Sequence, residues 1–492
     1  MKILPFLLLF LFFSFCSKKA TERRVDPSTI VAIVADDTVF VNDLIRRCEF
    51  TVRPIYCQQD GIQDKRICLN SLIAEKLFAL EAGEDNPLTG NEKFRARLQG
   101  IKEQLMREEL IRDQVVDKIE IPEEEVRQAY LNSRKTVHTE AVFIPASYDA
   151  DAIYRDARQG TPLQKLSEKY PGVSGVVKRD VKWGHIDEEA QNAIFNDKVT
   201  RGTVLAPLAM KDGYRLIKVT GWTEQVELSP ANRDLQMQNI RSKLRDYYIR
   251  KYYKEFAQSL MRGKRIDFFE KGWQVVVATL QQAYVPKGEA DNLPEIPMSR
   301  LEPLYDHLAD NGDLPFMQVD GKIWTIDDFR QAMLVHPLEI SQKSLTKENF
   351  TNRLQAAIAG LVTDQYLTRL AYEKKYDKSH TVNRLVKEWK NYYLFLYQRD
   401  QYLARRGFKG KIARDYFEAF DNYLTPYFDS LKVKYDQYIR FNPAALDSLQ
   451  LTRIPMIAYK TKGPYTPVVP PFPLVTNSHK TNYKRLPTAL QQ

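Results

Sequence analysis

Two strand-like runs bound the stretch of sequence that decides the fold. Residues 137–144 read Val-His-Thr-Glu-Ala-Val-Phe-Ile, and residues 213–219 read Gly-Tyr-Arg-Leu-Ile-Lys-Val. Between them lie a short helical pattern, a glycine-rich patch and the run Asp180-Val181-Lys182-Trp183-Gly184. Apolar runs of strand length with a helical pattern between them predict a small α+β module. We expect this module to span residues 137–222.

The composition describes an ordinary globular protein of several domains. The chain has 492 residues, of which 43% are hydrophobic and 28% are charged, so it can bury cores. Its net charge of +10 is small beside 73 basic and 63 acidic residues, which predicts mixed, solvated charged faces. No basic run is long enough for a nucleic-acid-binding arm, and we expect no nucleic-acid partner.

The N-terminus has the pattern of an export signal. Lys2 precedes an apolar run that ends at Cys16, and this run is too short to span a bilayer. The cysteine at its end resembles a bacterial lipoprotein signal, although Phe15 stands where a small residue is usual. The resemblance implies cleavage before Cys16 and lipid attachment to Cys16, which anchors the protein to a membrane. Ser17 then implies the periplasmic side of the outer membrane. An ordinary signal peptide or a short anchor is the alternative.

Three further cysteines, Cys48, Cys57 and Cys68, lie close together in the sequence. In an exported protein two of them could form a disulfide, and the third would then stay free or pair elsewhere. No histidine lies near them, so we expect no metal site. Small buried residues with at most one bridge are the simplest interpretation.

The region before the module combines a hairpin with helices. Ile30–Val34 and Thr38–Val41 flank a short acidic turn and predict a hairpin, after which Asn42 is expected to cap a helix. Residues 69–80 carry leucines and an isoleucine at helical spacing, and Gly83 is a plausible stop. Pro122 followed by three glutamates predicts the start of another helix.

Three segments of this region carry a family resemblance. They read Val-Ala-Ile-Val-Ala-Asp-Asp-Thr-Val (31–39), Leu-Asn-Ser-Leu-Ile-Ala-Glu-Lys-Leu-Phe-Ala-Leu-Glu-Ala (69–82) and Ile-Pro-Glu-Glu-Glu-Val-Arg-Gln-Ala-Tyr (121–130). Their order and spacing resemble the SurA/PrsA/PpiD group of exported peptidyl-prolyl isomerases and chaperones, over roughly residues 28–275. The resemblance implies an α+β protein in which helical chaperone modules flank a parvulin-like (rotamase) domain at 137–222. It implies unfolded or outer-membrane polypeptides as partners and no cofactor.

The same resemblance gives the positions of a parvulin pocket, and this sequence departs from the family at each of them. The histidine of the first strand falls on Ala141, the histidine of the last strand on Arg215, and the pocket phenylalanine on Ala190. The family's cysteine or aspartate falls on Gly172 or Val173. We therefore predict a degenerate pocket with no catalytic residue, in which isomerase activity is weak or lost.

Four polar residues near this pocket have ordinary explanations. His138 and His185 do not align with the family's histidines, and in an alternating strand residue 138 points to the face opposite residue 141. We expect both to be surface or turn histidines. Asp180 is expected to make hydrogen bonds in a turn, and Arg215 to be solvated, or else to contact peptide carbonyls or acidic clients.

The remainder of the chain divides into five segments. Residues 17–136 form the first helical module, and 223–285 form a helical extension whose aromatic face is either core or a client-binding surface. Residues 286–312 are a linker by composition. Residues 313–450 echo the N-terminal hairpin and helix and predict a second, diverged module, closed by a strand at Ile439–Asn442; two unrelated pieces are the alternative. Residues 1–16 are the signal described above. Residues 451–492 form a basic, proline-rich tail that is extended or disordered. This tail is either a flexible end or a docking arm.

Three functions are compatible with these features. The first is a lipid-anchored periplasmic chaperone that holds unfolded or outer-membrane polypeptides. The second is an active peptidyl-prolyl isomerase. The third is a non-catalytic subunit of an envelope secretion or assembly complex, with the tail as its docking element.

Overall fold

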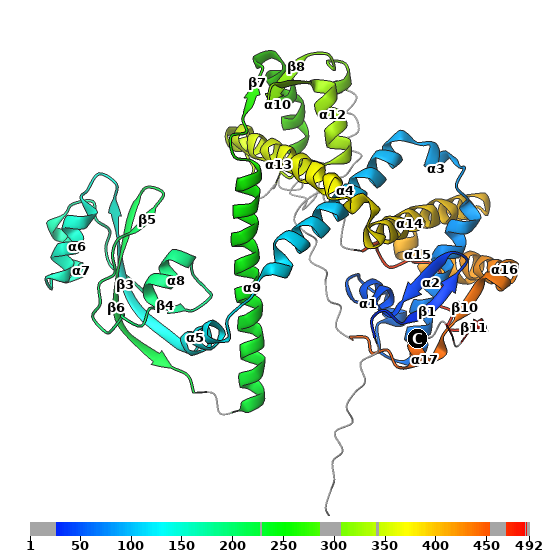
Figure 1. Cartoon of the computed structure of the whole chain (residues 1–492), viewed down its shortest axis with the longest axis horizontal. Helices are drawn as coiled ribbons and strands as arrows, with labels where there is room; N and C mark the ends of the chain where they lie inside the picture. Colours follow the sequence, from blue (N-terminus) through cyan, green and yellow to red (C-terminus); the bar gives the residue numbers. More distant parts are fainter. Residues whose placement is uncertain are drawn as a thin grey trace, which may run out of the picture. The chain divides into compact units, whose positions relative to one another are not determined.

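The computed structural model describes residues 26–226, 229–285, 307–340, 344–452, 469–487 and 489. About 58% of the chain is helix and 14% is strand, arranged as helices around small sheets, which confirms the predicted α+β class. The chain forms two compact units, one made of Met1–Glu109 with Gly263–Gln492 and the other of Leu110–Arg262 (Figure 1). Cys16 and most of the predicted linker lie outside the described residues.

The second unit, Leu110–Arg262, contains the predicted module. Its sheet has the strand order β4-β3-β6-β5, and all of its neighbouring strands are antiparallel. The elements of this unit are η2 (Val116–Lys118), α5 (Glu123–Ser133), β3 (Lys135–Pro145), α6 (Ala150–Arg158), α7 (Leu163–Lys169), β4 (Val177–Lys182), α8 (Glu188–Ile194), β5 (Leu208–Met210), β6 (Gly213–Glu224) and α9 (Pro230–Leu260). The two strand-like runs of the sequence are thus the paired central strands β3 and β6.

Helices cover both faces of this sheet, and each face has its own core (Figure 1). Val142 and Ile144 of β3 pack with residues of α6 and α7. Val137 and Ala141 of the same strand pack with residues of α8. Successive side chains of a strand point to opposite faces, which produces this division.

The first unit contains two sheets. One has the order β11-β10-β1-β2 and the other the order β7-β8-β9. The elements around the first sheet are β1 (Ile30–Val34), β2 (Asp37–Phe40), α1 (Val41–Glu49), η1 (Ile55–Cys57), α2 (Ile62–Ala82), α3 (Pro87–Gly90), α4 (Glu92–Gln114), η4 (Tyr376–Lys378), α14 (His380–Arg405), α15 (Ile412–Ala419), η5 (Phe420–Leu424), α16 (Thr425–Lys434), η6 (Asp436–Tyr438), β10 (Ile439–Phe441), α17 (Pro443–Asp447) and β11 (Lys484–Arg485). Those around the second are β7 (Ile266–Phe268), α10 (Glu270–Tyr284), β8 (Pro315–Val319), β9 (Lys322–Thr325), α12 (Ile326–Val335) and α13 (Lys347–Glu373).

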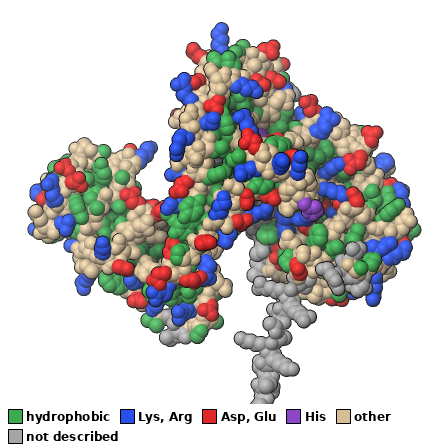
Figure 2. All heavy atoms as spheres, viewed as in Figure 1, with side chains coloured by type: hydrophobic (Ala, Val, Ile, Leu, Met, Phe, Trp, Pro, Cys, Tyr) green, Lys and Arg blue, Asp and Glu red, His purple; other side chains and the backbone are tan. Residues whose placement is uncertain are grey.

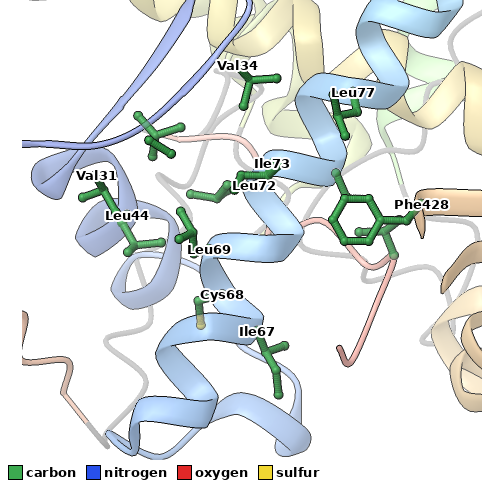
Figure 3. Close-up of a cluster of buried hydrophobic side chains, with 14 of the residues drawn as sticks. Val31, Val34, Leu44, Ile67, Cys68, Leu69, Leu72, Ile73, Leu77 and Phe428 are labelled. Carbon is green, nitrogen blue, oxygen red and sulfur yellow. The ribbon is translucent and has the colours of Figure 1, made fainter. Parts of the chain in front are cut away.

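Helix α2 is the centre of the larger core. Its apolar side chains, among them Leu69, Ile73 and Leu77, are buried against the hairpin, α1 and Phe428 of α16 (Figure 3). The helix is longer than the predicted 69–80, but it ends before Gly83, as the sequence indicates. Residues from the N-terminal part of the chain, such as Val31, and from its C-terminal part, such as Val475, are buried in this one core.

The two hairpins of this unit have the same order of elements. Each hairpin turn contains a non-glycine residue with positive φ, Ala35 (54°) and Asp320 (48°), and each hairpin leads directly into a helix. In both helices an aspartate at the third position accepts a hydrogen bond from the backbone of the capping residue, Asp43 from Phe40 and Asp328 from Thr325. The cap of the first helix is therefore completed by Asp43 and not by Asn42, which was predicted. That the segments are a diverged repeat stays a prediction.

The third strand of each sheet corrects one expectation. The strand at Ile439–Phe441 was predicted to close the second module, but it pairs with β1 of the first hairpin, with Ala32 opposite Phe441. The second hairpin is closed by β7, in which Phe268 lies opposite Met317. Burial explains the choice, because Ile439 and Phe441 enter the larger core, whereas Phe268 packs on Trp273 and Phe316.

The described part of the tail is extended, and several of its apolar side chains are buried. Val469, Phe472, Val475 and Leu486 all belong to the buried apolar residues of the first unit. β11 pairs in parallel with β10, and the amide of Leu486 donates a 2.8 Å hydrogen bond to the carbonyl of Phe441. Apolar side chains of residues 469–476, together with Leu486, are therefore buried in the first unit, whereas residues 477–485 are partly or fully exposed.

Two glycines of the first unit provide a matched test of helix packing. A Cβ on Gly272 of α10 would lie 2.2 Å from the carbonyl oxygen of Pro315, whereas a Cβ on Gly360 of α13 would meet nothing within 4 Å. We expect Gly272→Ala to lower the free energy of unfolding by about 1–3 kcal/mol, since backbone must move. Gly360→Ala should raise it by up to about 1 kcal/mol through helix propensity. Urea denaturation of both variants measures the difference, and equal effects would refute the assigned contact.

The surface charges and the lengths of the apolar helices were compared with the sequence. On the face drawn in Figure 2, basic and acidic side chains are interspersed, as the near balance of 73 and 63 predicts. Within the described ranges, no helix is both apolar enough and long enough to span a bilayer.

Candidate functional site

Three of the four predicted pocket residues lie on the face of the module sheet that α8 covers. Ala141 and Ala190 pack in one core with Ile217. Arg215 is two residues before Ile217 on β6, so it points to the same face. Its Nη1 lies 3.8 Å from Oδ2 of Asp187, the residue that caps α8. The structure thus brings Ala141, Ala190 and Arg215 to the same side of the sheet.

Val173 does not join them. It packs in the other core, with Val142, Ile144 and Leu166, on the face covered by α6 and α7. Gly172, the alternative position, has φ of 108° and approaches the ring of Tyr148. Three of the four predicted residues therefore share one face of the sheet, and Val173 lies on the other.

The two histidines of the module lie elsewhere, as predicted. Nδ1 of His138 is 2.7 Å from Oδ1 of Asp180, its direct partner on β4. His138 and Ala141 are three residues apart on β3, so their side chains point to opposite faces of the sheet. His138 therefore faces away from Arg215. His185 is exposed in the turn after β4, where its amide donates to the carbonyl of Lys182 at 3.2 Å. Asp180 thus pairs with a histidine on a strand, which corrects the expected turn hydrogen bonds.

The chemistry available on the α8 face is limited to packing and to hydrogen-bond donation. Methyl groups of Ala141 and Ala190 cannot exchange protons, and an arginine guanidinium stays charged and only donates. The 3.8 Å approach of Arg215 to Asp187 is longer than a hydrogen bond, so this partly exposed pair contributes at most about 1 kcal/mol. Among the described residues, no group of three or more histidines, cysteines, aspartates or glutamates could hold a metal ion.

A polar cleft of about 550 Å³ lies in the same unit, and no sequence pattern predicted it. It is formed by the ends of α5, β4 and β6 together with α9, and its lining includes Arg134, Lys182, Trp183, His185 and Lys243. Arg134 is held there by a 2.8 Å hydrogen bond from Nε to the carbonyl of Gln225. Trp183 is buried against Ile240 and Leu244 of α9. Trp183 was the one residue of this cleft that stood out in the sequence. Its burial depends on packing against α9, and the order of residues around Trp183 does not predict that contact.

Tyrosines of α9 hold this helix against the module. Oη of Tyr248 donates to both carboxylate oxygens of Glu125 at 2.9 Å, and burial together with this carboxylate raises the pKa of Tyr248 to about 12. Oη of Tyr247 donates to Glu188, and this hydrogen bond raises the pKa of Tyr247 to about 12. Tyr252 stacks on Tyr248 and stays exposed. The aromatic face of α9 thus serves partly as an internal contact and partly as exposed apolar surface.

Comparison of the sequence with protein-family models and with curated proteins gave no match. Among solved structures, the chain is similar to PrsA proteins, with low identity and low TM-scores. The peptidylprolyl isomerase PrsA from Bacillus anthracis is 14% identical, with a TM-score of 0.19 over 38% of this chain and 96% of that one. PrsA from Bacillus cereus is 15% identical, with a TM-score of 0.20 over 57% and 99%. The foldase protein PrsA from Streptococcus pneumoniae is 14% identical, with a TM-score of 0.18 over 31% and 55%.

Proposed function

We propose that this protein is a lipid-anchored chaperone of the exported peptidyl-prolyl isomerase type, whose parvulin-like module has little or no isomerase activity. It holds unfolded or outer-membrane polypeptides on the periplasmic side of the outer membrane, anchored through Cys16. The proposal rests on the resemblance of the sequence to the SurA/PrsA/PpiD group. The observation that carries it is the content of the α8 face, where the two family histidine positions are Ala141 and Arg215.

The loss of activity follows from what isomerisation needs. Rotation about a peptide bond has a barrier of about 18–20 kcal/mol, and an enzyme lowers it with fixed polar groups around the twisted amide. Ala141 and Ala190 offer none, and the guanidinium of Arg215 lies near a carboxylate. The histidines of the module, His138 and His185, are not on this face.

Client binding has separate support in the second unit. Leu235 and Tyr252 of α9 and Trp222 and Val226 at the end of β6 are large apolar residues that stay exposed. Exposed apolar side chains combined with the donors of the polar cleft suit an extended polypeptide, which offers carbonyl groups and apolar side chains. Holding of this kind needs no proton transfer.

Two assays on the same protein test the proposal. We expect no acceleration of a proline-limited refolding phase, which takes tens to hundreds of seconds, even at a molar excess of the chaperone. We expect suppression of aggregation of a chemically unfolded client in the same buffer. An active parvulin serves as the positive control for the first assay. Acceleration would support the active-isomerase alternative, and absence of both effects would reject the chaperone.

Two variants locate the effect. Arg215→Ala should leave aggregation suppression within about twofold, because this side chain makes only a weak ion pair. The combined variant Leu235→Ser and Tyr252→Ser should weaken suppression, since it removes exposed apolar surface without touching a buried residue. Light scattering of the client measures both. The reverse order of effects would place client binding on the α8 face.

A further inference from the structure

Two lysines of the polar cleft have no acidic partner among the residues that the structure describes. Lys182 is the exposed last residue of β4, and Lys243 is an exposed residue of α9. Neither ammonium group forms an ion pair within the described ranges. Lys178, four residues earlier on the same strand, does form one, with Glu140 at 3.4 Å. The two charges of the cleft are therefore available to a ligand.

A tight turn brings these two charges to the same part of the cleft. The amide of His185 donates to the carbonyl of Lys182 at 3.2 Å, which closes the turn after β4. Gly184 in this turn has a φ of 79°, and a Cβ there would lie 3.3 Å from Nζ of Lys243. Lys243 thus reaches from α9 to the turn that begins at Lys182. Two positive charges beside one turn repel each other, and an anionic group bound there relieves the repulsion.

The third cation of the lining is partly neutralised within the protein. Nη2 of Arg134 lies 3.2 Å from Oε1 of Glu224, and its Nε donates to the carbonyl of Gln225 at 2.8 Å. The described residues that line the cleft include no aspartate or glutamate. The cleft therefore carries an excess of positive charge that favours an anionic ligand.

The uncharged lining suits a polypeptide better than a small anion. The side-chain amides of Gln225, Gln236 and Asn239 line the cleft, and an amide both donates and accepts hydrogen bonds, as an extended backbone requires. Trp183 forms an apolar wall, and Val226 at the rim is 70% exposed. An inorganic anion gains nothing from these apolar contacts, whereas the side chains of a polypeptide do.

We propose that this cleft binds an acidic segment of a client polypeptide, with carboxylates of the segment at Lys182 and Lys243 and its backbone along the amides. The inference rests on the proposed chaperone function and adds to it a preference among clients. Both lysines are exposed, so each ion pair stabilises only weakly and the segment is held reversibly.

Fluorescence anisotropy of short labelled peptides tests the preference. One peptide alternates glutamate with valine and serine, and its copy has glutamine in place of each glutamate. We expect the full chain to bind the glutamate peptide at least about fivefold more tightly. Equal affinity for the two peptides would overturn the proposal. Displacement of the glutamate peptide when sodium phosphate replaces sodium chloride at the same ionic strength would also overturn it, because the cleft would then be a site for inorganic anions.

Two double variants with the same net charge locate the binding. Lys182→Gln with Lys243→Gln removes both unpaired charges of the cleft. Lys178→Gln with Lys251→Gln removes one exposed charge from the same strand and one from the same helix, both outside the cleft. We expect the first to weaken binding of the glutamate peptide by about five- to tenfold and the second by less than about twofold. Equal weakening by both would mean attraction by net charge alone and would refute the assigned site.

Aggregation suppression by the same preparations separates this inference from the proposed function. If the two peptides bind alike while aggregation of an unfolded client is still suppressed, the charge preference is wrong and the chaperone function stands. If neither peptide binds and aggregation is not suppressed, both are rejected.

Discussion

Replacing Arg47 by methionine is expected to lower the free energy of unfolding of the first unit by about 3–5 kcal/mol. Arg47 and Glu75 are each only 1% exposed, and their side chains form an ion pair between α1 and α2. Nη1 of Arg47 also lies 3.2 Å from Glu388 of α14, and Nη2 donates to the carbonyl of Pro471 at 2.9 Å. Removal of the guanidinium leaves the carboxylate of Glu75 buried without this partner. Urea denaturation followed by hydrogen exchange at the amides of α2 measures the loss.

The pH dependence of this variant has a defined sign. Burial alone would lower the pKa of Arg47, but attraction to Glu75 and Glu388 outweighs it and raises that pKa. Burial already holds the pKa of Glu75 above its ordinary value, although Arg47 lowers it, and loss of Arg47 raises that pKa further. A raised carboxyl pKa favours folding when the group is protonated, so stability is lost as pH rises from the unfolded pKa through the folded one. The deficit of Arg47→Met relative to the natural protein should therefore shrink toward acid pH.

A matched exposed pair is the control for this experiment. Arg127 and Glu124 form a 2.7 Å ion pair on α5 with both side chains about two-thirds exposed. Arg127→Met should change stability by less than about 1 kcal/mol, because water already solvates both charges. A loss below about 1 kcal/mol for Arg47→Met as well would show that Glu75 finds another partner or protonates without cost.

Deletion of residues 453–492 is expected to unfold the first unit. The described part of this segment buries Val469, Phe472, Val475 and Leu486, and each fully buried side chain of this size stabilises by about 1.5–3 kcal/mol. The deletion also removes Ser478 and Lys480, whose carbonyls accept hydrogen bonds from Asn70 on α2 at 2.6 and 3.1 Å. The sum is comparable to the whole stability of an ordinary domain. Loss of exchange protection in α2, with protection in β3 retained, is the expected measurement.

Point variants distinguish packing from charge in this segment. Phe472→Ala should cost about 3–5 kcal/mol by leaving a cavity in the core. Lys484→Ala should cost under about 1 kcal/mol, since Lys484 makes only an exposed pair with Asp436. A truncated chain with full protection of α2 would mean that the segment is dispensable for folding. In that case a docking role for it would again be the better explanation.

Local patterns in the sequence were enough to predict most of the elements. Alternating apolar residues predicted both hairpins and the central strands β3 and β6 within one to several residues, and helical patterns predicted α2 and α9. The facing of Ala141 and Arg215, with His138 on the opposite side, also followed from the two-residue repeat of a strand. These features depend on residues that are close together along the chain, so the local sequence pattern is enough to predict them.

The sequence by itself determined the α+β class, the hairpins and most of the helices. Only the tertiary structure decided that β10 closes the first sheet and β7 the second, that Val173 packs away from the predicted pocket, and that Phe472 and Val475 of the tail enter the larger core. The physical reason is that strand pairing and burial are set between surfaces hundreds of residues apart in the chain. A single strand such as Ile439–Phe441 offers the same hydrogen bonds to either hairpin, and the choice is made by where its side chains are buried.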